Sequence, residues 1–388
     1  MNILLLDTAF AAAPIYNGLI EAGHDVWVMG NRPDDLLARA AGARWIDQNY
    51  RDVDAVRDHV ARLGIERIVP GCTDVSIETV VELEAGAHLR DDAQTNLALG
   101  HKAQFRALCE LLDLPAPRVV DPQSFPRPGR FICKPVDAFS GRGITVFNGA
   151  DTGALASALE AARAASRSGD ALIEPYVGDR LFSCSGFLRD GAFTQVFFVR
   201  EGSSVNPYAV DTSNVVYDFA DDHATALTSS LERLARHLRL KDGLLHTQFI
   251  LSEHGPMIVE VSRRCPGDLY PLLIEYSTGF RFAAAYAAAF AGYAFETRPS
   301  ERRHVLRHTV TADSRVEYGG LVFAGAAPVI AFYPIARMGE ELLPRQGNRA
   351  GLLFTEYASA AALEDAYASI IARENYHVRG ALKATNSD

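Results

Sequence analysis

The stretch FICKPVDAFSGRGITVF, Phe131–Phe147, decides how the rest of the chain is interpreted. Its pattern predicts a strand that ends at Lys134-Pro135, a loop with glycines at 141 and 143, and a second strand behind the loop. Glycines let backbone N–H groups approach a polyphosphate closely, and a nearby lysine adds a positive charge. The stretch is compatible with a phosphate-binding loop but does not establish one by itself. An ordinary glycine-rich hairpin beside a surface lysine is the competing interpretation.

A second stretch, LIEPYVGDR (Leu172–Arg180), comes after a helix expected over 151–168. Its acid, Glu174, ends a buried strand and is followed at once by a proline, so the chain changes direction there. Such a hinge can present backbone C=O and N–H groups to the edge of a base. A plain strand that ends in a turn explains the same residues.

A third stretch, HTQFILSEHGPMIVEVSRRCPGD (His246–Asp268), predicts two antiparallel strands about a short turn. The pairing places Gln248 opposite Glu260, with Ser262 on the same face because strand side chains alternate. Three oxygen-bearing side chains suit a hard cation such as Mg²⁺. The two arginines after Ser262 suit phosphate or carboxylate recognition. A solvated polar face is the alternative.

Outside these stretches, strand and helix signals alternate along the first ninety residues. Strands are expected at 2–7, 24–30, 43–47 and 65–71, with helices at 12–23, 34–41, 52–63 and 75–85. This order predicts a parallel, doubly wound sheet. The segment after the first strand, DTAFAAAPIYNG, lacks the G-x-G-x-x-G fingerprint, so dinucleotide binding is not expected.

From residue 96 onward the expected elements are more varied. They are a helix at 97–112, a proline-rich connector at 115–128 with a short strand at 118–120, a hairpin at 181–200 that turns at Asp190-Gly191, a helix at 225–240, strands near 305–312 and 351–356, and a helix at 360–374. The apolar run at 282–295 is 14 residues long, short of the about 20 that span a bilayer, and is interpreted as a buried alanine-rich helix.

Composition narrows the class of protein. The 388 residues are 48% hydrophobic and 22% charged, which predicts a globular chain of two or three domains. A net charge of −10 argues against nonspecific binding of nucleic acid or anionic membrane. The N-terminus has no signal-peptide pattern, and the five cysteines form no C-x-x-C pair, so neither a disulfide framework nor a zinc site is expected. A cytoplasmic protein is therefore predicted.

The order and spacing of these stretches resemble the ATP-grasp superfamily over roughly residues 1–300. Lys102 precedes Lys134 by 32 residues, Glu174 comes 40 later, and the Gln248/Glu260 hairpin completes the series. The resemblance implies a mixed α/β and α+β chain, in which a Rossmann-like parallel-sheet domain precedes a two-lobed ATP-grasp fold. The implied parts are the Rossmann-like domain at 1–95, a small lobe with a linker helix and glycine-rich lid at 96–177, a large lobe with the metal-binding hairpin at 178–300, and a C-terminal part at 301–388 that completes the large lobe or forms a small lid domain.

Within that superfamily, EVSRRCPGD and the preceding HTQ look most like carboxylate–amine ligases, whose forms are similar to E-i-N-x-R-x-x-G-D and H-T-E. The chain differs from them at two metal positions. Gln248 stands where many members have Glu, as in carbamoyl phosphate synthetases, and Ser262 replaces the usual Asn. These differences leave open whether one metal ion binds or two.

The resemblance assigns a role to each matching residue. It implies ATP-phosphate contacts for Lys102 and Lys134, a lid of Ser140, Gly141, Arg142 and Gly143, an adenine-binding hinge of Glu174, Pro175, Tyr176 and Val177, a ribose contact at Asp179, metal ligation by Gln248, Glu260 and Ser262, and Arg264 at the γ-phosphate. Arg264, Lys134 and Glu260 are the residues expected to serve catalysis. Further candidates for substrate binding are His246, Arg263, Gly267, Asp268, Arg307 and Asp74.

The implied activity is an ATP-dependent ligase that joins a small carboxylic or amino acid to an amine through an acyl phosphate. ATP and Mg²⁺ are the expected cofactors, with Mn²⁺ as a substitute. The expected partners are small-molecule substrates, with neither nucleic acid nor membrane. Ligases of this group are often dimers, so the resemblance implies a homodimer as one option, while the sequence itself does not give the oligomeric state. Two alternatives remain open at this point: an ATP-grasp small-molecule kinase and a non-catalytic nucleotide-binding subunit.

Overall fold

The structure is a computed structural model that describes residues 1–138, 141–325, 327–344 and 348–380. The chain divides into two compact units. The first holds Met1–Phe198, Tyr217–Leu272 and Arg281–Arg298, and the second holds Val199–Val216, Leu273–Phe280 and the described residues from Pro299 onward. The predicted boundaries at residues 95 and 177 both fall inside the first unit, and the predicted C-terminal part from residue 301 falls in the second.

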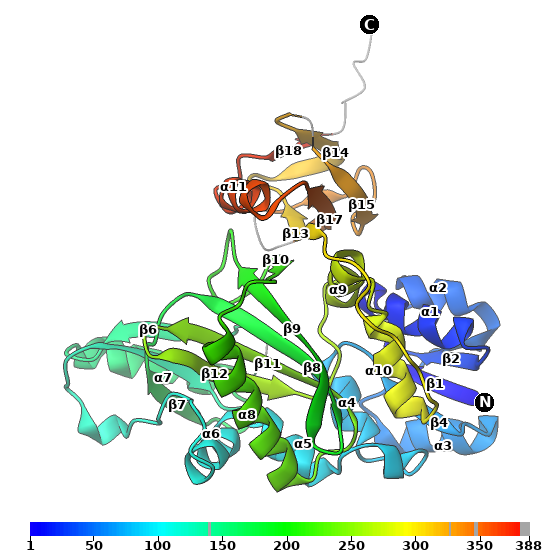
Figure 1. The fold of residues 1–388 in the computed structure, drawn as a ribbon, viewed down its shortest axis with the longest axis horizontal. Helices are drawn as coiled ribbons and strands as arrows, with labels where there is room; N and C mark the ends of the chain where they lie inside the picture. Colours follow the sequence, from blue (N-terminus) through cyan, green and yellow to red (C-terminus); the bar gives the residue numbers. More distant parts are fainter. Residues whose placement is uncertain (139–140, 326, 345–347, 381–388) are drawn as a thin grey trace, which may run out of the picture. The chain divides into compact units, whose positions relative to one another are not determined.

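The first unit begins with the expected parallel sheet, whose strand order is β3-β2-β1-β4. Figure 1 labels three of these strands, β2, β1 and β4, side by side. Its strands are β1 (Asn2–Leu6), β2 (Asp25–Met29), β3 (Trp45–Ile46) and β4 (Arg67–Pro70). The helices between and after them are η1 (Phe10–Ala12), α1 (Ala13–Glu21), α2 (Leu36–Ala41), η2 (Gly42–Arg44), α3 (Val53–Leu63), α4 (Asp74–Val80) and η3 (Ala87–Leu89). The prediction of a parallel α/β domain is confirmed.

The strand ends of this sheet pack closely at their carboxyl edge. A Cβ atom on Gly71 would lie 2.1 Å from the Cβ of Asp7, so no larger residue fits without displacing the strand end. The Asp7 carboxylate accepts the backbone N–H groups of Ala9 and Cys72, which joins the turns after β1 and β4. This contact fixes the segment from which α4 begins.

The alanine-rich run forms a buried helix, α10 (Phe282–Ala291), as predicted. It packs against α1 and β4, where Gly18 leaves room for the backbone of Ala284 and Tyr286 donates a hydrogen bond to the carbonyl of Pro70. Within the described residues, no helix combines the length and the apolar character needed to span a bilayer.

The single helix predicted over 97–112 is two helices, α5 (Ala93–Gly100) and α6 (Lys102–Leu111). His101 lies between them with an extended backbone, and its ring Nδ1 accepts the N–H of Gln104 at the start of α6. The break lets the amide of Lys102 donate to Val136 O, at 2.9 Å, instead of continuing the helix.

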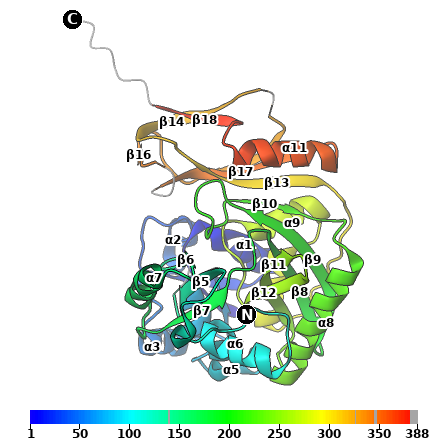
Figure 2. The same cartoon turned by 90° about the vertical axis from the view of Figure 1, so that its left-hand side faces the viewer.

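A three-stranded antiparallel sheet comes next in the chain, in the order β6-β5-β7, and α7 packs on it (Figure 2). Its elements are β5 (Arg130–Pro135), β6 (Thr145–Asn148), α7 (Thr152–Ala165) and β7 (Ala171–Pro175), preceded by η4 (Pro122–Ser124). The strand predicted at 118–120 is absent from these described residues, although Val120 N still donates to Ile173 O at 2.8 Å.

The remainder of the first unit is built on longer antiparallel strands in the order β12-β11-β8-β9, with α8 packed against β12. These are β8 (Leu181–Arg189), β9 (Ala192–Gly202), α8 (Asp221–Leu238), β11 (Gly243–Ser252) and β12 (Gly255–Ser262). Asp190 and Gly191 both have positive φ angles, 52° and 73°, which is the tight hairpin turn that the Asp-Gly pair predicts.

The second unit contains the end of β9 and two antiparallel groups of strands. One has the order β10-β13-β17-β15 and the other β16-β14-β18. The elements are β10 (Thr212–Val215), the end of α9 (Tyr270–Thr278), β13 (His304–Thr311), β14 (Val316–Phe323), β15 (Val329–Pro334), β16 (Glu341–Leu342), β17 (Arg349–Tyr357), α11 (Ala360–Ile371) and β18 (Tyr376–Gly380). Helix α11 packs Leu363, Tyr367 and Ile370 against Leu306 of β13.

Candidate active site

A buried carboxylate, Glu174, lies at the end of β7 and holds two cations. Its side chain is 1% exposed, with Lys134 Nζ 2.7 Å from Oε2 and Arg106 Nε 2.5 Å from Oε1. Lys134 and Glu174 are diagonal neighbours on one face of the β5–β7 pair, because Lys134 lies opposite Leu172. Burial opposes ionisation, but the charges of Lys134 and Arg106 outweigh it and lower the pKa of Glu174. The carboxylate is therefore charged at neutral pH.

Lys102, the first residue of α6, lies between the base of the glycine-rich loop and the β11–β12 hairpin. Its Nζ donates to Ala138 O at 2.7 Å. Its electrostatic neighbours are Glu260, Lys134 and Asp74, so residues predicted from distant stretches do converge. Burial lowers the pKa of the Lys102 ammonium, and Glu260 opposes that effect.

The glycine-rich loop is described at Gly141, Arg142 and Gly143, while Ser140 lies outside the described residues. Gly141 and Gly143 have φ angles of 70° and 71°, a conformation that favours glycine. A Cβ on Gly143 would lie 2.5 Å from the Cβ of Ala165 on α7, so glycine is also required by close packing. The predicted turn is thus a tight one against α7.

The β11–β12 hairpin has the predicted register. Gln248 lies opposite Glu260, and His246 lies opposite Ser262. Phe249 then pairs with Ile258, so Val259 is the extra residue of a β-bulge directly beside Glu260. Glu260 is exposed, and the Ser262 hydroxyl accepts the N–H of Arg264 at 3.1 Å.

The predicted metal-binding residues offer oxygen donors of the kind that Mg²⁺ prefers. Among the residues that the structure describes, no group of three His, Cys, Asp or Glu side chains could hold a metal ion. The predicted set supplies one carboxylate, an amide oxygen and a hydroxyl. Mg²⁺ is commonly held by one or two carboxylates together with substrate phosphates and water. The hairpin therefore suits a cation that arrives with a phosphorylated ligand.

Arg264 and Asp74, predicted independently as site residues, form an ion pair. Arg264 Nε lies 2.6 Å from Asp74 Oδ1, and NH2 lies 3.4 Å from Oδ2. Asp74 is the first residue of α4, directly after the carboxyl edge of the parallel sheet. Burial opposes the charge of Arg264, but Asp74 outweighs it and raises the pKa of the guanidinium. Arg264 NH1 also donates to Cys265 O.

Comparison with known proteins gives structural likeness without sequence likeness. No protein-family model matches the chain, and no curated protein sequence matches it. Phosphoribosylglycinamide synthetase from Anaerococcus prevotii is similar at a TM-score of 0.76 and 13% identity, over 98% of this chain and 99% of that one. L-amino acid ligase from Bacillus licheniformis is similar at a TM-score of 0.76 and 15% identity, with the same coverage. The chain has the ATP-grasp fold.

A third structure with this fold is known with nucleotide. The biotin carboxylase domain dimer of 2-oxoglutarate carboxylase from Hydrogenobacter thermophilus, in complex with MgADP, ADP and bicarbonate, is similar at a TM-score of 0.72 and 15% identity. The match covers 98% of this chain and 90% of that one.

Arg106 is a residue of this ATP-grasp chain that sequence reasoning missed. It lies one helical turn after Lys102 on α6, and its NH2 donates to Val259 O at 2.8 Å. Its NH1 is buried and has no hydrogen-bond partner among the described residues. The spacing of four residues from Lys102 indicates that Arg106 lies on the same helix face, and this was the one available signal. The two acceptors of Arg106 lie far away in the sequence.

The hinge after Glu174 is less buried than Glu174 itself. Tyr176 N donates to Arg130 O at 2.9 Å, and the Arg130 guanidinium lies 4.3 Å from the centre of the Tyr176 ring. Val177 is partly buried, whereas Pro175 and Asp179 are exposed. Their adenine and ribose contacts stay predictions.

His246 belongs to a buried polar group beside the hairpin. Its Nδ1 lies 2.7 Å from Ser185 Oγ, and the Ser185 hydroxyl donates to Tyr270 at 3.1 Å. Because that hydroxyl proton is used, Nδ1 carries the ring proton and donates to Ser185. Burial, followed by the charge of Arg264, lowers the pKa of His246 to about 3. The ring is therefore uncharged at neutral pH and offers no positive charge to a carboxylate.

The turn after Arg264 has an unusual backbone. Asp268 and Leu269 both have positive φ angles, 53° and 55°, although neither is glycine. Tyr270 N closes the turn on Gly267 O at 3.1 Å. Left-handed conformations at consecutive non-glycine residues are strained, and such strain concentrates at functional sites. Asp268 and Gly267 thus stay candidates for substrate binding.

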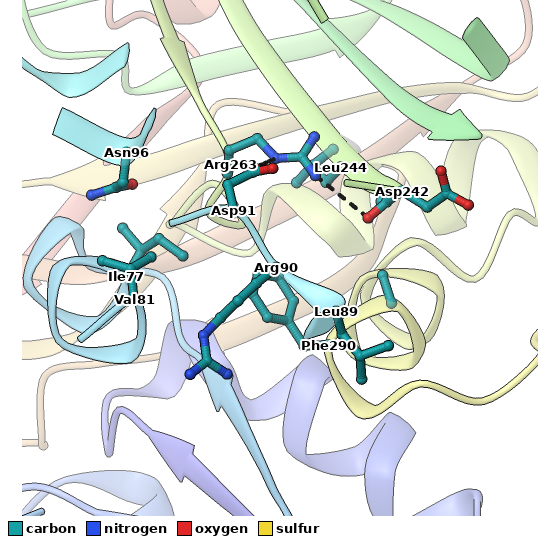
Figure 3. A pocket seen from close by; sticks show the side chains of 12 residues that line it. Ile77, Val81, Leu89, Arg90, Asp91, Asn96, Asp242, Leu244, Arg263 and Phe290 are labelled. Carbon is teal, nitrogen blue, oxygen red and sulfur yellow. Dashed lines mark hydrogen bonds and ion pairs between the residues drawn. The ribbon is translucent and has the colours of Figure 1, made fainter. Parts of the chain in front are cut away.

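Arg263 does not lie with the other predicted residues, and its substrate-binding role stays a prediction. Strand alternation turns it away from the face of Ser262. It is 7% exposed, and its Nε lies 2.7 Å from Asp91 Oδ2, while NH2 donates to Lys241 O at 2.6 Å. Figure 3 shows it beside Asp91 in a pocket whose other walls include Leu89, Leu244 and Phe290. The pocket has room for about one water molecule.

Arg307, the last predicted residue, lies on β13 in the second unit. Its side chain is buried, and NH2 donates to Ser213 on β10 at 2.9 Å. The two residues are cross-strand partners. Its substrate role stays a prediction.

Proposed function

We propose that this chain is an ATP-dependent ligase that joins a small carboxylic or amino acid to an amine and releases ADP and phosphate. One observation carries the proposal: four cationic side chains, Lys102, Arg106, Lys134 and Arg264, meet three carboxylates, Glu174, Glu260 and Asp74. Two of these cations, Lys134 and Arg106, are buried, and the other two are partly buried. A cluster of cations at low solvent exposure attracts an anionic ligand. A triphosphate supplies that anion.

The ligase reaction has two steps. A carboxylate oxygen attacks the γ-phosphorus, an O–P bond forms, the bond to the β-phosphate oxygen breaks, and ADP leaves. The amine then attacks the acyl phosphate, a C–N bond forms, the C–O bond breaks, phosphate leaves, and the nitrogen loses a proton. Positioning and charge stabilisation account for most of the catalysis in such phosphoryl transfers.

Three of the four cations contact the nucleotide in this scheme. Lys102 and Lys134 bind the phosphates, while Glu174 holds Lys134 in position. Arg264 uses one N–H on each terminal nitrogen for Asp74 and Cys265, so the second N–H on each is available for the transferring phosphoryl group. The glycine-rich loop covers the phosphates and protects the acyl phosphate from water.

Gln248, Glu260 and Ser262 would hold Mg²⁺, with Mn²⁺ as a substitute. When bound, the ion neutralises charge on the phosphate oxygens. The complex of a structural neighbour with MgADP and bicarbonate supports this pairing of nucleotide, metal and a small carboxylate-like anion. A homodimer is proposed for the assembled enzyme, and light scattering of the purified chain tests it.

Calorimetry with ATP and Mg²⁺, followed by a phosphate-release screen over pairs of small acids and amines, tests the proposed activity. We expect magnesium-dependent ATP binding, phosphate release that needs both an acid and an amine, and an acyl hydroxamate when hydroxylamine replaces the amine. An acid-stable phosphoester formed without an amine would indicate a kinase instead. If the chain binds no ATP in the presence of Mg²⁺, the proposal is wrong.

Glu260→Ala tests the metal assignment. Glu260 is exposed, so its removal should leave the free energy of unfolding nearly unchanged while turnover falls at least about 100-fold, as for loss of an electrostatic catalytic group. Glu253→Ala is the matched control because Glu253 is an exposed glutamate at the tip of the same hairpin. Equal turnover in the two variants would remove Glu260 from the metal site.

A further inference from the structure

The position of Arg106 joins three parts of the proposed site. It lies on α6 four residues after Lys102, so both side chains leave the same face of the helix. Its guanidinium is 3% exposed and touches the hinge carboxylate Glu174 through Nε and the bulge carbonyl of Val259 through NH2. A single side chain thus contacts both the hinge and the hairpin.

The bulge contact matters because Val259 directly precedes Glu260 in the strand. Val259 is the extra residue of the bulge. A bulge turns the neighbouring side chain to a new direction, and its backbone groups drop out of the regular ladder. Arg106 provides a charged donor for the Val259 carbonyl, which keeps the bulge in place and so fixes the direction of Glu260.

The hinge contact acts in the same way on Lys134. Glu174 divides its two carboxylate oxygens between Lys134 and Arg106. Without Arg106, the full charge of Glu174 would act on Lys134 and draw the ammonium away from a phosphate. Arg106 thereby sets the charge that Lys134 can offer to a phosphate, as well as the direction of Glu260.

We propose that Arg106 is the positioning residue that couples the nucleotide hinge to the metal-binding hairpin, so that ATP and Mg²⁺ bind cooperatively. This inference rests on the proposed nucleotide site. Arg106 touches neither ligand in this arrangement. Loss of a residue that orients metal ligands typically weakens metal affinity roughly 10- to 100-fold.

Two substitutions separate the contacts. Arg106→Lys keeps a positive charge beside Glu174. A compact ammonium group cannot donate to Glu174 and to the Val259 carbonyl at the same time, as the planar guanidinium does. Arg106→Met removes both contacts. By calorimetry, we expect Arg106→Lys to raise the half-saturating Mg²⁺ concentration at fixed ATP about tenfold or more. Arg106→Met should weaken both Mg²⁺ and ATP.

Arg90→Lys is the control for a purely structural arginine. Arg90 is 5% exposed and donates to the carbonyls of Leu83 and Ala85, away from the proposed site. We expect it to lower the melting temperature while leaving the Mg²⁺ and ATP affinities unchanged. In a Glu260→Ala background, the magnesium effect of Arg106→Lys should vanish, because the two changes act on one ligand.

The outcomes are distinct. If the wild-type chain binds no ATP, the proposed function and this inference are both wrong. If it binds ATP and Arg106→Lys behaves like Arg90→Lys, only the coupling role of Arg106 is wrong. Should Arg106→Met not fold, Arg106→Lys alone decides the question.

Discussion

Glu174 shows how much depends on one buried carboxylate. Its substitution by Gln would leave Lys134 and Arg106 buried with no counter-charge, and breaking a buried pair typically costs roughly 3–5 kcal/mol. We therefore expect Glu174→Gln to lower the free energy of unfolding by an amount in that range, measured by urea denaturation. Glu84→Gln, which breaks an exposed pair with Arg57, should cost below about 1 kcal/mol. Equal losses would contradict the burial argument.

Asp137 gives a pH-dependent prediction at the base of the glycine-rich loop. Burial opposes its charge, but hydrogen bonds from the Ser166 hydroxyl and the backbone N–H groups of Arg167 and Ser168 outweigh it and lower the pKa of Asp137 to about 2. A carboxyl group whose pKa is depressed on folding stabilises the protein above its unfolded pKa of about 4. That stability is lost as the pH falls from about 4 to 2.

Asp137→Asn should remove this contribution. We expect the variant to be less stable at pH 7 by about 1 kcal/mol, since the group is partly solvated, and to lose less stability than the wild type between pH 4 and pH 2. Unfolding in urea at several pH values measures both. Parallel pH profiles for the two proteins would show that Asp137 is not the titrating group.

At the scale of single residues, the sequence predicted the register that pairs Gln248 with Glu260, but not the residues that contact the lysines and the arginines. Lys134 and Glu174 were recognisable because each lies at a strand end beside proline. Arg106 was not, because its acceptors are 68 and 153 residues away and one of them is a backbone carbonyl. The pairing of Asp74 with Arg264 spans 190 residues and has no local signal either.

At the scale of elements, the turn between β5 and β6 allows a test of whether its close packing matters for stability and for ATP binding. Gly143→Ala would strain a positive φ angle and place a methyl group 2.5 Å from Ala165. We expect a loss of unfolding free energy of about 1–3 kcal/mol, together with weaker ATP binding by calorimetry. Gly169→Ala is the control: its φ angle is 78°, yet nothing lies within 4 Å of the added carbon. If both variants bind ATP equally well, close packing of this turn is unimportant for the nucleotide.

Helices and strands with a clear sequence pattern of their own were predicted. Those whose bounds depend on contacts with distant residues were not. The apolar spacing of 97–112 continues through His101, so only the bond from Lys102 N to Val136 O reveals why the helix breaks there. The β14, β15, β16 and β18 strands of the second unit escaped prediction. Buried and exposed residues do not alternate regularly along these strands, so the sequence lacks the alternating apolar pattern that predicts a strand.

For the whole molecule, the concentration of buried charge predicts a large response to ligand. A ligand that binds only the folded state stabilises it by about 2.7 kcal/mol at 100 times its dissociation constant. We expect ADP with Mg²⁺ to raise the melting temperature by several degrees in scanning calorimetry. ADP with a chelator in place of Mg²⁺ should raise it less. No shift at saturating nucleotide would mean that the cationic residues do not bind it.

The strained turn at Asp268-Leu269 has a consequence for protein engineering. Leu269 is 2% exposed, so removing its side chain would cost more stability than the relieved strain returns. Asp268 is only partly buried, and glycine adopts its backbone angles without penalty, so Asp268→Gly is a substitution that selection for heat resistance would favour. The same change would loosen the segment that leads from Arg264 into α9, and selection for turnover would reject it. A deep mutational scan scored separately for abundance and for activity should therefore rank glycine at residue 268 in opposite ways.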